Sequence, residues 1–373
     1  MHRTDVMHDT VFRFSDELGP RSILHLYDPK HGLKAILVVD NVAAGPAIGG
    51  VRMAPDVSLE ECFRLARAMT FKNAAAGLAH GGGKSVIFGD PSMAPEHKEA
   101  TIRAFARAIA AITDYIPGPD MGTDETAMAW IFDEIGRCVG LPRELGGIPL
   151  DEIGATGFGL VVAAEVAAGH IGLGLDGARI AVQGFGAVGK HAARFFAARG
   201  ARLVAAADSS ATVHDPAGLD VEALSAFKES GARLADWNTG KVLEREAVVT
   251  VDCDILVPAA QPDAVHADNA GDVQARLLVP GANIGVSHEA ETALHRRGIL
   301  CLPDFIVNAG GVICAAIEYH AGTQSQALAT IEERIRANTT EVLQRAEDEE
   351  TLPRQAAVAM AGDRVRKALA CRR

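Results

Sequence analysis

The segment from Ala178 to Asp208 constrains the fold most strongly. A short apolar run at 178–183 leads into a glycine-rich turn, an apolar helical stretch and a second apolar run that ends in Asp208. The turn has the spacing GxGxxG and consists of Gly184, Phe185, Gly186, Ala187, Val188 and Gly189. Strand, turn, helix and strand in this order form a βαβ unit, whose two strands lie parallel in one sheet.

The three glycines and the final acid of this unit also indicate a ligand. Gly184 allows a tight turn, Gly186 allows the backbone to approach a pyrophosphate, and Gly189 lets the helix pack on the strand. Free N–H groups at the helix N-terminus attract phosphates. Asp208, 24 residues after Gly184, is placed to accept hydrogen bonds from adenosine ribose hydroxyls. The pattern therefore predicts a dinucleotide site that favours NAD over NADP.

From Ala155 onward, helical stretches alternate with apolar strands. The strands are expected at 178–183, 201–207, 254–257, 277–279 and 299–301. This alternation predicts a Rossmann-type domain over residues 141–334, entered through a Pro/Gly-rich hinge at 141–154. Residues 1–140 then form a separate N-terminal α/β domain, and a charged helical tail at about 335–373 packs back on it or on a neighbouring subunit. The expected fold class is α/β, with two domains separated by a cleft.

The N-terminal half has strand and helix patterns of its own. The expected elements are strands at 33–40 and 84–88 and helices at 58–72, 96–112 and 128–135. Ser58 and Glu61 have the spacing of a capping box, so Ser58 is expected to cap the first of these helices. The first strand ends in a Gly-rich segment at Gly45, Gly49 and Gly50, and residues 117–120 are expected in a loop, because glycine and proline usually interrupt regular structure.

Two lysines twelve residues apart, Lys72 and Lys84, are the strongest candidates for chemistry in this half. Lys84 directly follows Gly81, Gly82 and Gly83, where a backbone without Cβ atoms can approach a ligand closely. Two ammonium groups in one closed site repel each other, and burial disfavours charge, so at least one lysine is expected to have a lowered pKa. Such a lysine serves as a general base near neutral pH. Taken alone, the pair also fits two solvated surface lysines.

Composition and charge exclude several classes of function. The net charge of −12 argues against nucleic acid as a partner, and no apolar run reaches the roughly 18 residues of a membrane span. The six cysteines form no CxxC pair and the thirteen histidines no HExxH-type cluster, so we expect no metal site. Scattered cysteines, and an N-terminus at 2–9 without the apolar core of a secretion signal, indicate a cytoplasmic protein.

Further motifs follow one another along nearly the whole chain. They lie at 45–53, 69–78, 81–84, 118–123, 155–159, 281–283 and 303–312, in addition to the glycine turn. Through these motifs the chain resembles the glutamate/leucine/phenylalanine/valine dehydrogenase family. The resemblance implies oxidative deamination, in which an L-amino acid, NAD⁺ and water give a 2-oxo acid, ammonium and NADH. It also suggests a homo-oligomer.

The resemblance implies roles for residues in both halves. Lys84 matches the lysine that activates the attacking water, Asp120 matches the acid that relays protons at the substrate nitrogen, and Lys72 matches the lysine that binds the α-carboxylate. The other implied substrate-site positions are Ile48, Gly49, Gly50, Gly118, Asn308, Val312 and Ala315. The implied cofactor positions are Thr156, Asp208, Ala260, Asn283 and the turn 184–189. These residue types suit the reaction, which needs a fixed cation, a base and a proton donor.

Two departures from the family pattern bear on the substrate. Glutamate-specific members hold the side-chain carboxylate with a lysine and a serine where this chain has Ile48 and Ala315, and a carboxylate facing these two would be buried unpaired. We therefore expect an apolar amino acid such as leucine, valine or isoleucine. Phenylalanine or another aromatic amino acid is an alternative, followed by glutamate, whose enzymes the motifs at 120–123 and 128–131 resemble more closely. A silent NAD-binding sensor or scaffold is the non-enzymatic alternative.

Overall fold

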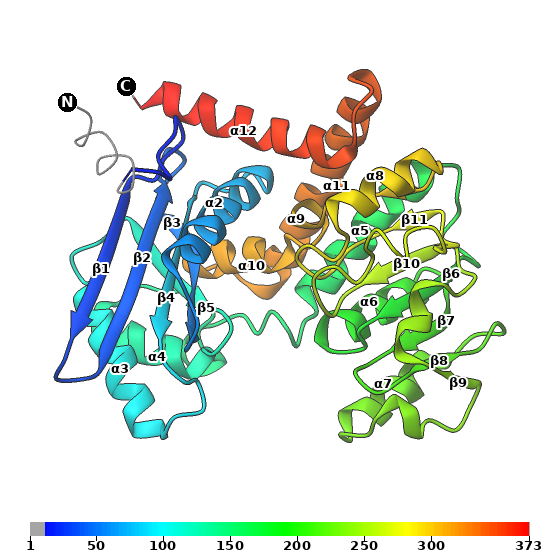
Figure 1. Ribbon diagram of the computed structural model, residues 1–373, viewed down its shortest axis with the longest axis horizontal. Coiled ribbons are helices and arrows are strands. Elements are labelled where there is room, and N and C mark those ends of the chain that lie inside the picture. The colour runs from blue at the N-terminus through cyan, green and yellow to red at the C-terminus, as the bar shows by residue number, and fades with distance from the viewer. Residues whose placement is uncertain (1–11, 373) are drawn as a thin grey trace, which may run out of the picture. The chain divides into compact units, whose positions relative to one another are not determined.

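The computed structural model describes residues 12–372, which form two compact units. Unit 1 comprises the chain up to residue 149, residues 315–324 and the segment from 361 onward, and unit 2 comprises 150–314 and 325–360. Each unit has its own sheet, with helices packed on it (Figure 1). The expected two-domain α/β fold is confirmed. The N-terminal residues in which we found no secretion signal lie outside the described part of the chain.

Within the described residues, the sheet of unit 1 has five strands in the order β1-β2-β4-β3-β5. They are β1 (Ser22–Asp28), β2 (Leu33–Asn41), β3 (Ala47–Ala54), β4 (Gly81–Phe88) and β5 (Tyr115–Pro119). β2 pairs antiparallel with β1 and β4, whereas β3 pairs parallel with β4 and β5. β3 therefore lies between β4 and β5, the strands that carry or precede the candidate catalytic residues.

Helices cover both faces of this sheet (Figure 1). α2 (Leu59–Ala75) packs on one face, and α3 (Pro95–Ala108) and α4 (Glu125–Ile135) pack on the other. α2 begins as expected, because the hydroxyl of Ser58 accepts a hydrogen bond from the backbone N–H of Glu61 at 3.1 Å.

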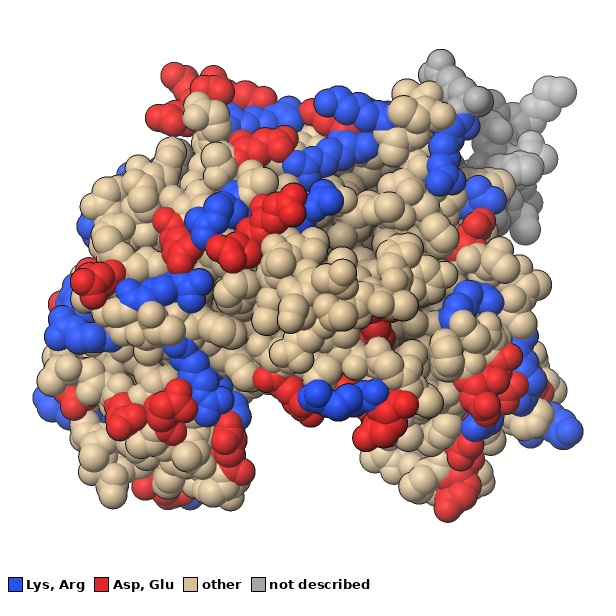
Figure 2. All heavy atoms as spheres, turned by 180° about the vertical axis from the view of Figure 1, so that it is seen from behind, with Lys and Arg blue, Asp and Glu red and all other residues tan. Residues whose placement is uncertain are grey.

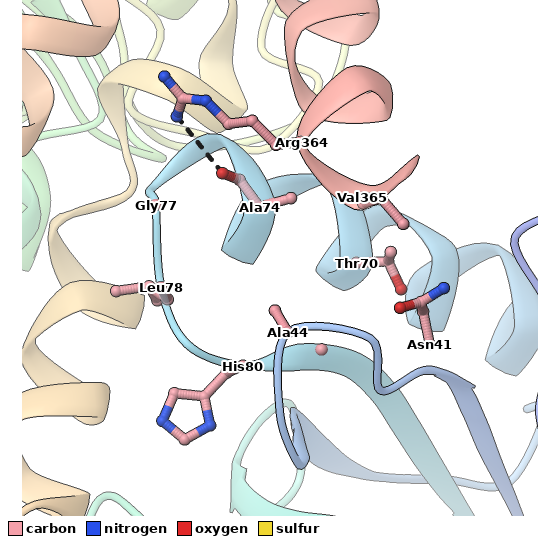
Figure 3. Close-up of a pocket in the computed structure, with 10 residues that line it drawn as sticks. Asn41, Ala44, Thr70, Ala74, Gly77, Leu78, His80, Arg364 and Val365 are labelled. Carbon is pink, nitrogen blue, oxygen red and sulfur yellow. Dashed lines mark hydrogen bonds between the residues drawn. The ribbon is translucent and has the colours of Figure 1, made fainter. Parts of the chain in front are cut away.

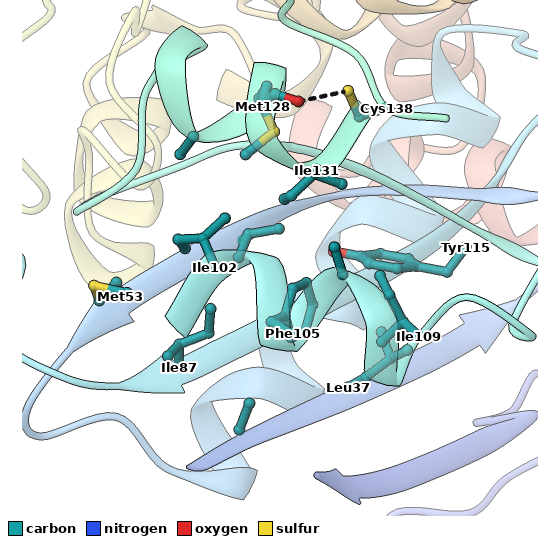
Figure 4. Close-up of a cluster of buried hydrophobic side chains, with 14 of the residues drawn as sticks. Leu37, Met53, Ile87, Ile102, Phe105, Ile109, Tyr115, Met128, Ile131 and Cys138 are labelled. Atoms are coloured by element: carbon teal, nitrogen blue, oxygen red, sulfur yellow. Dashed lines mark hydrogen bonds between the residues drawn. The ribbon is translucent and has the colours of Figure 1, made fainter. Parts of the chain in front are cut away.

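β2 contributes to both layers because successive side chains of a strand point to opposite faces. Its residues Leu37 and Val39 join the cluster that contains α3 and α4, whereas Ile36 and Val38 join the cluster beneath α2. Figure 4 shows the first cluster, in which Leu37 lies beside Phe105 and Ile109. Alternating burial on both faces fixes the register of the sheet.

The Gly-rich segment after β2 contains a strand that the sequence pattern did not predict, and most of a second segment, 117–120, is a strand, so the loop expected there is wrong. Gly49 and Gly50 lie inside β3, and the prolines of the second segment belong to β5. Glycine weakens a strand in general, but it also marks places where another backbone approaches closely. Here a Cβ atom on Gly49 would lie 1.7 Å from the carbonyl oxygen of Gly83 in β4. Packing between the strands therefore outweighs local propensity.

Within the described residues, the sheet of unit 2 has seven strands in the order β12-β11-β10-β6-β7-β8-β9. They are β6 (Arg179–Gln183), β7 (Arg202–Ala207), β8 (Thr212–His214), β9 (Lys241–Leu243), β10 (Ile255–Pro258), β11 (Leu277–Leu278) and β12 (Leu300–Cys301). The strands from β12 to β7 are parallel, as expected. β8 and β9 add an antiparallel edge that the sequence pattern did not predict.

The helices after residue 150 follow the expected alternation. They are α5 (Ala155–His170), α6 (Ala187–Ala197), α7 (Val221–Glu229), α8 (His288–Arg296), α9 (Asp304–Val307), α10 (Gly310–Tyr319), α11 (Gln324–Asp348) and α12 (Pro353–Cys371). Short 3₁₀ turns lie at Arg143–Leu145, Leu234–Asp236 and Arg245–Val249. The C-terminal tail is two helices rather than one, because Pro353 suits a first helical turn but not a helix interior.

The described helices include none that is both long and apolar enough to cross a membrane. On the face drawn in Figure 2, acidic and basic side chains are interspersed. The whole chain has 48 acidic and 36 Lys or Arg residues. Mixed charges of this kind are typical of a solvated protein surface.

Candidate active site

Lys84 and Asp120 form a largely buried ion pair in unit 1. Lys84 stands in the middle of β4, and Asp120 directly follows β5. The Nζ atom of Lys84 donates a hydrogen bond to Oδ2 of Asp120. The side chain of Lys84 is 5% exposed and that of Asp120 is 17% exposed. The structure therefore brings the two expected catalytic residues into direct contact.

This contact depends on a glycine in β3, the strand between β4 and β5. A Cβ atom on Gly50 would lie 2.7 Å from Oδ2 of Asp120 and 2.9 Å from Nζ of Lys84. A methyl group at this distance would displace both side chains, because non-bonded carbon atoms prefer separations of about 3.5–4.0 Å. Gly50 thus leaves the space in which the pair meets across β3.

Arg52, two residues after Gly50, is a third member of the site that the sequence reasoning missed. Its Nε donates to Oδ1 of Asp120 at 2.9 Å, and its Nη1 donates to Oε1 of Glu61 in the first turn of α2 at 2.6 Å. Asp120 therefore has a cation on each carboxylate oxygen. Positions 50 and 52 lie on the same face of a strand. The sequence therefore predicts Arg52 beside the pair only if residues 47–54 are recognised as a strand.

Burial and charge shift the pKa values of this site in opposite directions. Burial lowers the pKa of Lys84, and attraction to Asp120 offsets only part of that effect. Burial alone would raise the pKa of Asp120, but Lys84 and Arg52 outweigh it and hold that pKa below its usual value. The expected lysine with a lowered pKa is confirmed, although burial is the main cause. The site thus pairs a lysine that loses its proton readily with a carboxylate that stays ionised.

Lys72 lies in the last turn of α2 and is half-buried. The next residue holds this turn to the sheet, because Nδ2 of Asn73 donates to the carbonyl oxygen of Gly81 at 2.7 Å. The helix also approaches β4 closely, since a Cβ atom on Gly82 would lie 2.0 Å from the backbone nitrogen of Thr70. The glycine run belongs to β4, and its glycines allow close packing inside unit 1: Gly82 against α2, and Gly81 against the backbone of Asn41 at the end of β2.

An apolar cluster contains two of the positions expected to contact the substrate side chain. Ile48 of β3 and Ala315 of α10 are buried in it together with Ile116 and Val139. A Cβ atom on Gly118 would lie 3.0 Å from Cγ2 of Val139, so this glycine also borders the cluster. Val312 is half-buried and belongs to unit 2.

Polar aromatic rings adjoin the same cluster. Tyr319 packs against it, and its ring meets the ring of His80 edge-on at 5.7 Å between centroids. His80 lies with its Nε2 atom 3.2 Å from Nε2 of His320. Burial lowers the pKa of His80, which favours the neutral imidazole.

The glycine turn of unit 2 has the shape that a dinucleotide requires. Gly184 has a φ of +97°, and a Cβ atom there would lie 2.5 Å from Cβ of Ala260. A Cβ atom on Gly189 would lie 2.0 Å from the carbonyl oxygen of Gly184, so α6 packs tightly on the turn. Gly186 is the N-cap of α6, and a Cβ atom on it would meet nothing within 4 Å. The start of α6 therefore has room for a pyrophosphate beside its free N–H groups.

The other residues of the turn differ in exposure. Phe185 is buried, 1% exposed, and its backbone N–H donates to the carbonyl oxygen of Ala207 at 2.7 Å. Ala187 is exposed and Val188 is half-buried in the first turn of α6. Phe185 thus anchors the turn in the core, and the backbone of the turn remains accessible.

A cavity of about 420 Å³ lies beside this turn at the end of β7. Its lining includes Asp208 and the cations Lys228 and Arg245. The carboxylate of Asp208 accepts hydrogen bonds from Nζ of Lys228 at 2.5 Å, Oγ of Ser210 at 2.5 Å and the N–H of Leu234 at 3.0 Å. Burial alone would raise the pKa of Asp208, but these donors hold it well below its usual value. Asp208 lies where expected, with partners that the sequence did not reveal.

Two asparagines expected at different ligands are in contact in unit 2. Nδ2 of Asn308 donates to Oδ1 of Asn283 at 3.0 Å and to the carbonyl oxygen of Gly281 at 3.3 Å. Oδ1 of Asn308 is buried and has no hydrogen-bond partner among the described residues. Thr156 lies in the first turn of α5 and is half-buried. Asn308, expected beside the substrate, thus contacts a candidate cofactor residue.

Unit 1 contains a second cavity of about 240 Å³, between α2 and the C-terminal end of the chain (Figure 3). The polar groups that border it bind within the protein. The hydroxyl of Thr70 donates to Asp40 at 2.6 Å, and Nη1 of Arg364 donates to the carbonyl oxygen of Ala75 at 2.6 Å. We therefore assign this cavity no ligand.

Known proteins share both units. Residues 146–373 match the model described as Glutamate/Leucine/Phenylalanine/Valine dehydrogenase, and residues 20–137 match Glu/Leu/Phe/Val dehydrogenase, dimerisation domain. The chain belongs to this family. It is an amino acid dehydrogenase, an oxidoreductase that acts on the CH–NH₂ group of its donor, and its Rossmann-type unit implies a nicotinamide cofactor.

Individual relatives are similar over most of the chain. The glutamate dehydrogenase of Aeropyrum pernix is 37% identical over 89% of this chain and 85% of its own length. The NADP(+)-dependent glutamate dehydrogenase of Pyrobaculum calidifontis is 38% identical over 76% of this chain and 71% of its own. The crystal structure of a hetero-hexameric glutamate dehydrogenase from Thermus thermophilus, in a Leu-bound form, has a TM-score of 0.84 at 30% identity and covers 100% of this chain and 98% of that chain.

These relatives overturn the expected substrate. The expectation of leucine, valine or isoleucine is wrong, because curated relatives that are 35–39% identical are glutamate dehydrogenases. Ile48 and Ala315 are not the only positions near which a side-chain carboxylate could find a partner. Polar groups adjoin the same cluster, because Tyr319 packs against it and the ring of His80 meets the ring of Tyr319.

Proposed function

We propose that this protein catalyses the oxidative deamination of L-glutamate to 2-oxoglutarate and ammonium with a nicotinamide dinucleotide. The observation that carries the chemistry is the buried contact between Lys84 and Asp120, reinforced by Arg52. The identity to glutamate dehydrogenases supports the choice of substrate. NAD is the cofactor that the ribose contact expected of Asp208 favours.

The side chains of unit 1 supply the proton transfers. A nicotinamide held by unit 2 would supply the hydride acceptor for the α-carbon, which converts the amino acid into an imine. Asp120, held as a carboxylate, accepts a proton from the substrate ammonium group. Neutral Lys84 then accepts a proton from the water that adds to the imine carbon, and Asp120 returns its proton to the nitrogen. When the C–N bond breaks, the hydroxyl proton passes to the departing ammonia, which leaves ammonium and the carbonyl group of the 2-oxo acid. Lys72 binds the α-carboxylate through its ammonium group.

The remaining site residues have positioning roles in this proposal. Gly49, Gly50 and Gly118 leave space beside the pair, and Val312 borders the substrate. In unit 2, the turn 184–189 and Ala260 border the pyrophosphate and adenosine. The hydroxyl of Thr156 and the amide of Asn283 contact the nicotinamide side of the cofactor. The amide of Asn308 lies beside the amino-acid head of the substrate.

The side-chain carboxylate of glutamate needs a hydrogen-bond donor, because Ile48 and Ala315 supply none. We propose the hydroxyl of Tyr319, whose ring packs against the same cluster. Tyr319→Phe should raise KM for glutamate about tenfold, as expected for the loss of a hydrogen bond to a charged group, with little change in kcat. Phe63→Leu, a ring lost elsewhere in unit 1, is the control. An unchanged KM in Tyr319→Phe would show that another group binds this carboxylate.

We further propose that several copies of the chain assemble in the cytoplasm. The N-terminal family model is described as a dimerisation domain, and a structurally similar glutamate dehydrogenase is hetero-hexameric. β1 is an edge strand that carries Tyr27, 75% exposed, and exposed edges of this kind readily pair with another chain. Sedimentation velocity on the purified protein tests this assembly.

A substrate panel tests the function. The purified protein is assayed with twenty L-amino acids at alkaline pH, each with NAD⁺ and with NADP⁺, and reduced cofactor is followed by its absorbance. We expect glutamate to give the highest kcat/KM. A higher kcat/KM for any apolar or aromatic amino acid refutes the proposed substrate, and no turnover with any amino acid refutes the catalytic roles of Lys84 and Asp120.

A further inference from the structure

Ile284, which directly follows the candidate cofactor residue Asn283, has a backbone conformation that its side chain disfavours. Its φ is +56°, in the left-handed region. Left to itself, a branched residue populates this region less than the ordinary ones by a factor of roughly 5 to 30. Such strain persists only where the surrounding structure holds it. Ile284 is 53% exposed, so the packing of its side chain does not provide that hold, and its backbone hydrogen bonds must.

Both peptide groups of Ile284 are fixed by hydrogen bonds. Its N–H donates to Oδ2 of Asp304 at 2.7 Å, and its carbonyl oxygen accepts from the N–H of Asp263 at 2.8 Å. Asp304 is the first residue of α9 and is buried, which shields its bond from water. A hydrogen bond to a carboxylate is roughly twice as strong as one between neutral groups. Asp304 is therefore the side chain that holds the left-handed turn.

Asp304 is itself held by an arginine 50 positions further along the chain. Arg354, in the first turn of α12, donates from Nη2 to Oδ1 of Asp304 at 2.7 Å. Nε of the same guanidinium lies 2.7 Å from each carboxylate oxygen of Glu291 in α8. The side chains of Arg354, Glu291 and Asp304 are 17%, 5% and 6% exposed. One guanidinium thus serves two buried carboxylates, which would both be unpaired without it.

The strained turn carries an amide that faces a candidate ligand. Oδ1 of Asn283 accepts from Nδ2 of Asn308 at 3.0 Å, which leaves Nδ2 of Asn283 as the group able to donate to a nicotinamide. The N–H of Asn308 donates to the carbonyl oxygen of Asp304 at 2.8 Å. Asp304 therefore fixes Asn308 through its backbone. It fixes Asn283 through its side chain, which holds the next peptide along the chain.

We propose that Arg354 is a positioning residue for the nicotinamide. Its guanidinium fixes Asp304, and Asp304 keeps the turn at Ile284 in the conformation that presents Asn283 to the ring. Without the guanidinium the carboxylate moves, the strain is no longer held, and most molecules leave this conformation. The inference rests on the proposed function only for the placement of the nicotinamide at Asn283.

Binding of two ligands to the full-length protein tests this role. NADH carries the nicotinamide, whereas ADP-ribose has the same adenosine, pyrophosphate and second ribose without it. NADH is titrated by fluorescence and ADP-ribose by calorimetry, so neither measurement needs turnover. Arg354→Met should weaken NADH about tenfold, because the competent conformation becomes a minor one. The same change should leave the affinity for ADP-ribose within about twofold of the native value.

Two further variants separate positioning from general damage. Glycine adopts a positive φ without strain, so Ile284→Gly in the Arg354→Met background should recover NADH affinity by at least about threefold. Arg179→Met is the matched control, because Arg179 also pairs with two carboxylates of unit 2, Asp252 and Asp254. Arg179 begins β6, whose other end leads into the glycine turn. Its removal should lower the urea midpoint of unfolding and leave both ligand affinities unchanged.

Arg354→Lys is the second variant if Arg354→Met does not fold. It keeps a cation beside the two carboxylates but lacks the planar fork that reaches both, so it should weaken NADH about threefold and ADP-ribose little. An Arg354 variant that keeps the native NADH affinity overturns the inference, as does one that weakens NADH and ADP-ribose equally. So does a loss of NADH affinity that Ile284→Gly leaves unrecovered. Because binding does not report turnover, the expected difference in a protein that deaminates no amino acid supports this inference and refutes only the proposed function.

Discussion

Arg52 offers the sharpest test of how the active site sets the pKa of its base. Removing this guanidinium, as in Arg52→Met, takes one cation away from Asp120 and leaves an apolar side chain of similar length. Arg52 also repels the ammonium form of Lys84. Both changes favour protonated Lys84, because the repulsion disappears and Asp120 then attracts Lys84 alone. We therefore expect the variant to need a higher pH for the same rate.

The size of the effect follows from the geometry. Asp120 holds Lys84 on Oδ2 and Arg52 on Oδ1, so the two cations lie roughly 6 Å apart and repel by about 3 kcal/mol at an effective dielectric constant of 20. Glu61 offsets part of the charge of Arg52, and the Arg52 side chain is 19% exposed. About half of the repulsion then remains, equivalent to about one pH unit at 1.36 kcal/mol per unit.

The assay is the pH profile of kcat for glutamate deamination under saturating cofactor. Neutral Lys84 acts as the base, so kcat rises with pH through the pKa of Lys84, which is lowered from its ordinary value. Arg52→Met should displace this rise by about one pH unit toward alkaline pH, and lower kcat about tenfold on the acid limb. Arg52→Lys keeps the charge and should stay close to the native profile.

Two further variants make the result specific. Arg107→Met removes an arginine of α3 that pairs with Glu134, and should leave the profile unchanged. Glu61→Gln removes the other partner of Arg52 and should displace the rise slightly toward acid pH, the opposite sign. If Arg52→Met lowers kcat equally at every pH, Arg52 only holds structure and the electrostatic argument fails.

Other expected outcomes concern the same unit. Lys84→Ala should lower kcat at least about 100-fold while NADH binding, followed by fluorescence, stays within about twofold; retention of a tenth of the native rate would contradict its role as base. Gly50→Ala should lower kcat roughly 10- to 100-fold because a methyl group would lie 2.7 Å from the Asp120 carboxylate, whereas an unchanged kcat would mean that the pair adapts. Glu318→Ala should lower the free energy of unfolding in urea by about 3 kcal/mol, because its carboxylate accepts three backbone N–H groups within 140–148 at 2.7, 3.0 and 2.9 Å; a loss below about 1 kcal/mol would show that water replaces it.

The parts of the fold that the sequence predicted are those whose signals lie within a short segment of the chain. β6, the glycine turn, α6 and β7 lie within 179–207, and each signal in that stretch is local: apolar strand, glycine spacing and helix periodicity. Ser58 likewise caps α2 through a residue only three positions away. Lys84 and Asp120 were found through motifs, and the structure joins them although 36 positions separate them.

The parts that the sequence did not predict depend on distant neighbours. β3 and β5 contain the glycines and prolines of a loop, and only the adjacent backbone of β4 makes a side chain at Gly49 impossible. β8 and β9 are three residues each, too short for an alternating pattern to appear. Arg52 lies 68 positions from Asp120, and neither segment alone has a feature that predicts this contact.

In both candidate sites, a carboxylate that a sequence motif locates has a cationic partner that the motif does not reveal. The motifs predict that Asp120 relays protons and that Asp208 accepts hydrogen bonds from the adenosine ribose, each from its own position in the sequence. In the structure each is paired with a cation from another element, Asp120 with Arg52 as well as Lys84, and Asp208 with Lys228. Pairing lowers both pKa values and changes the charge that a ligand meets. The motif locates a carboxylate, but its chemistry depends on which cation the fold places beside it, and that pairing is what Arg52→Met removes at Asp120.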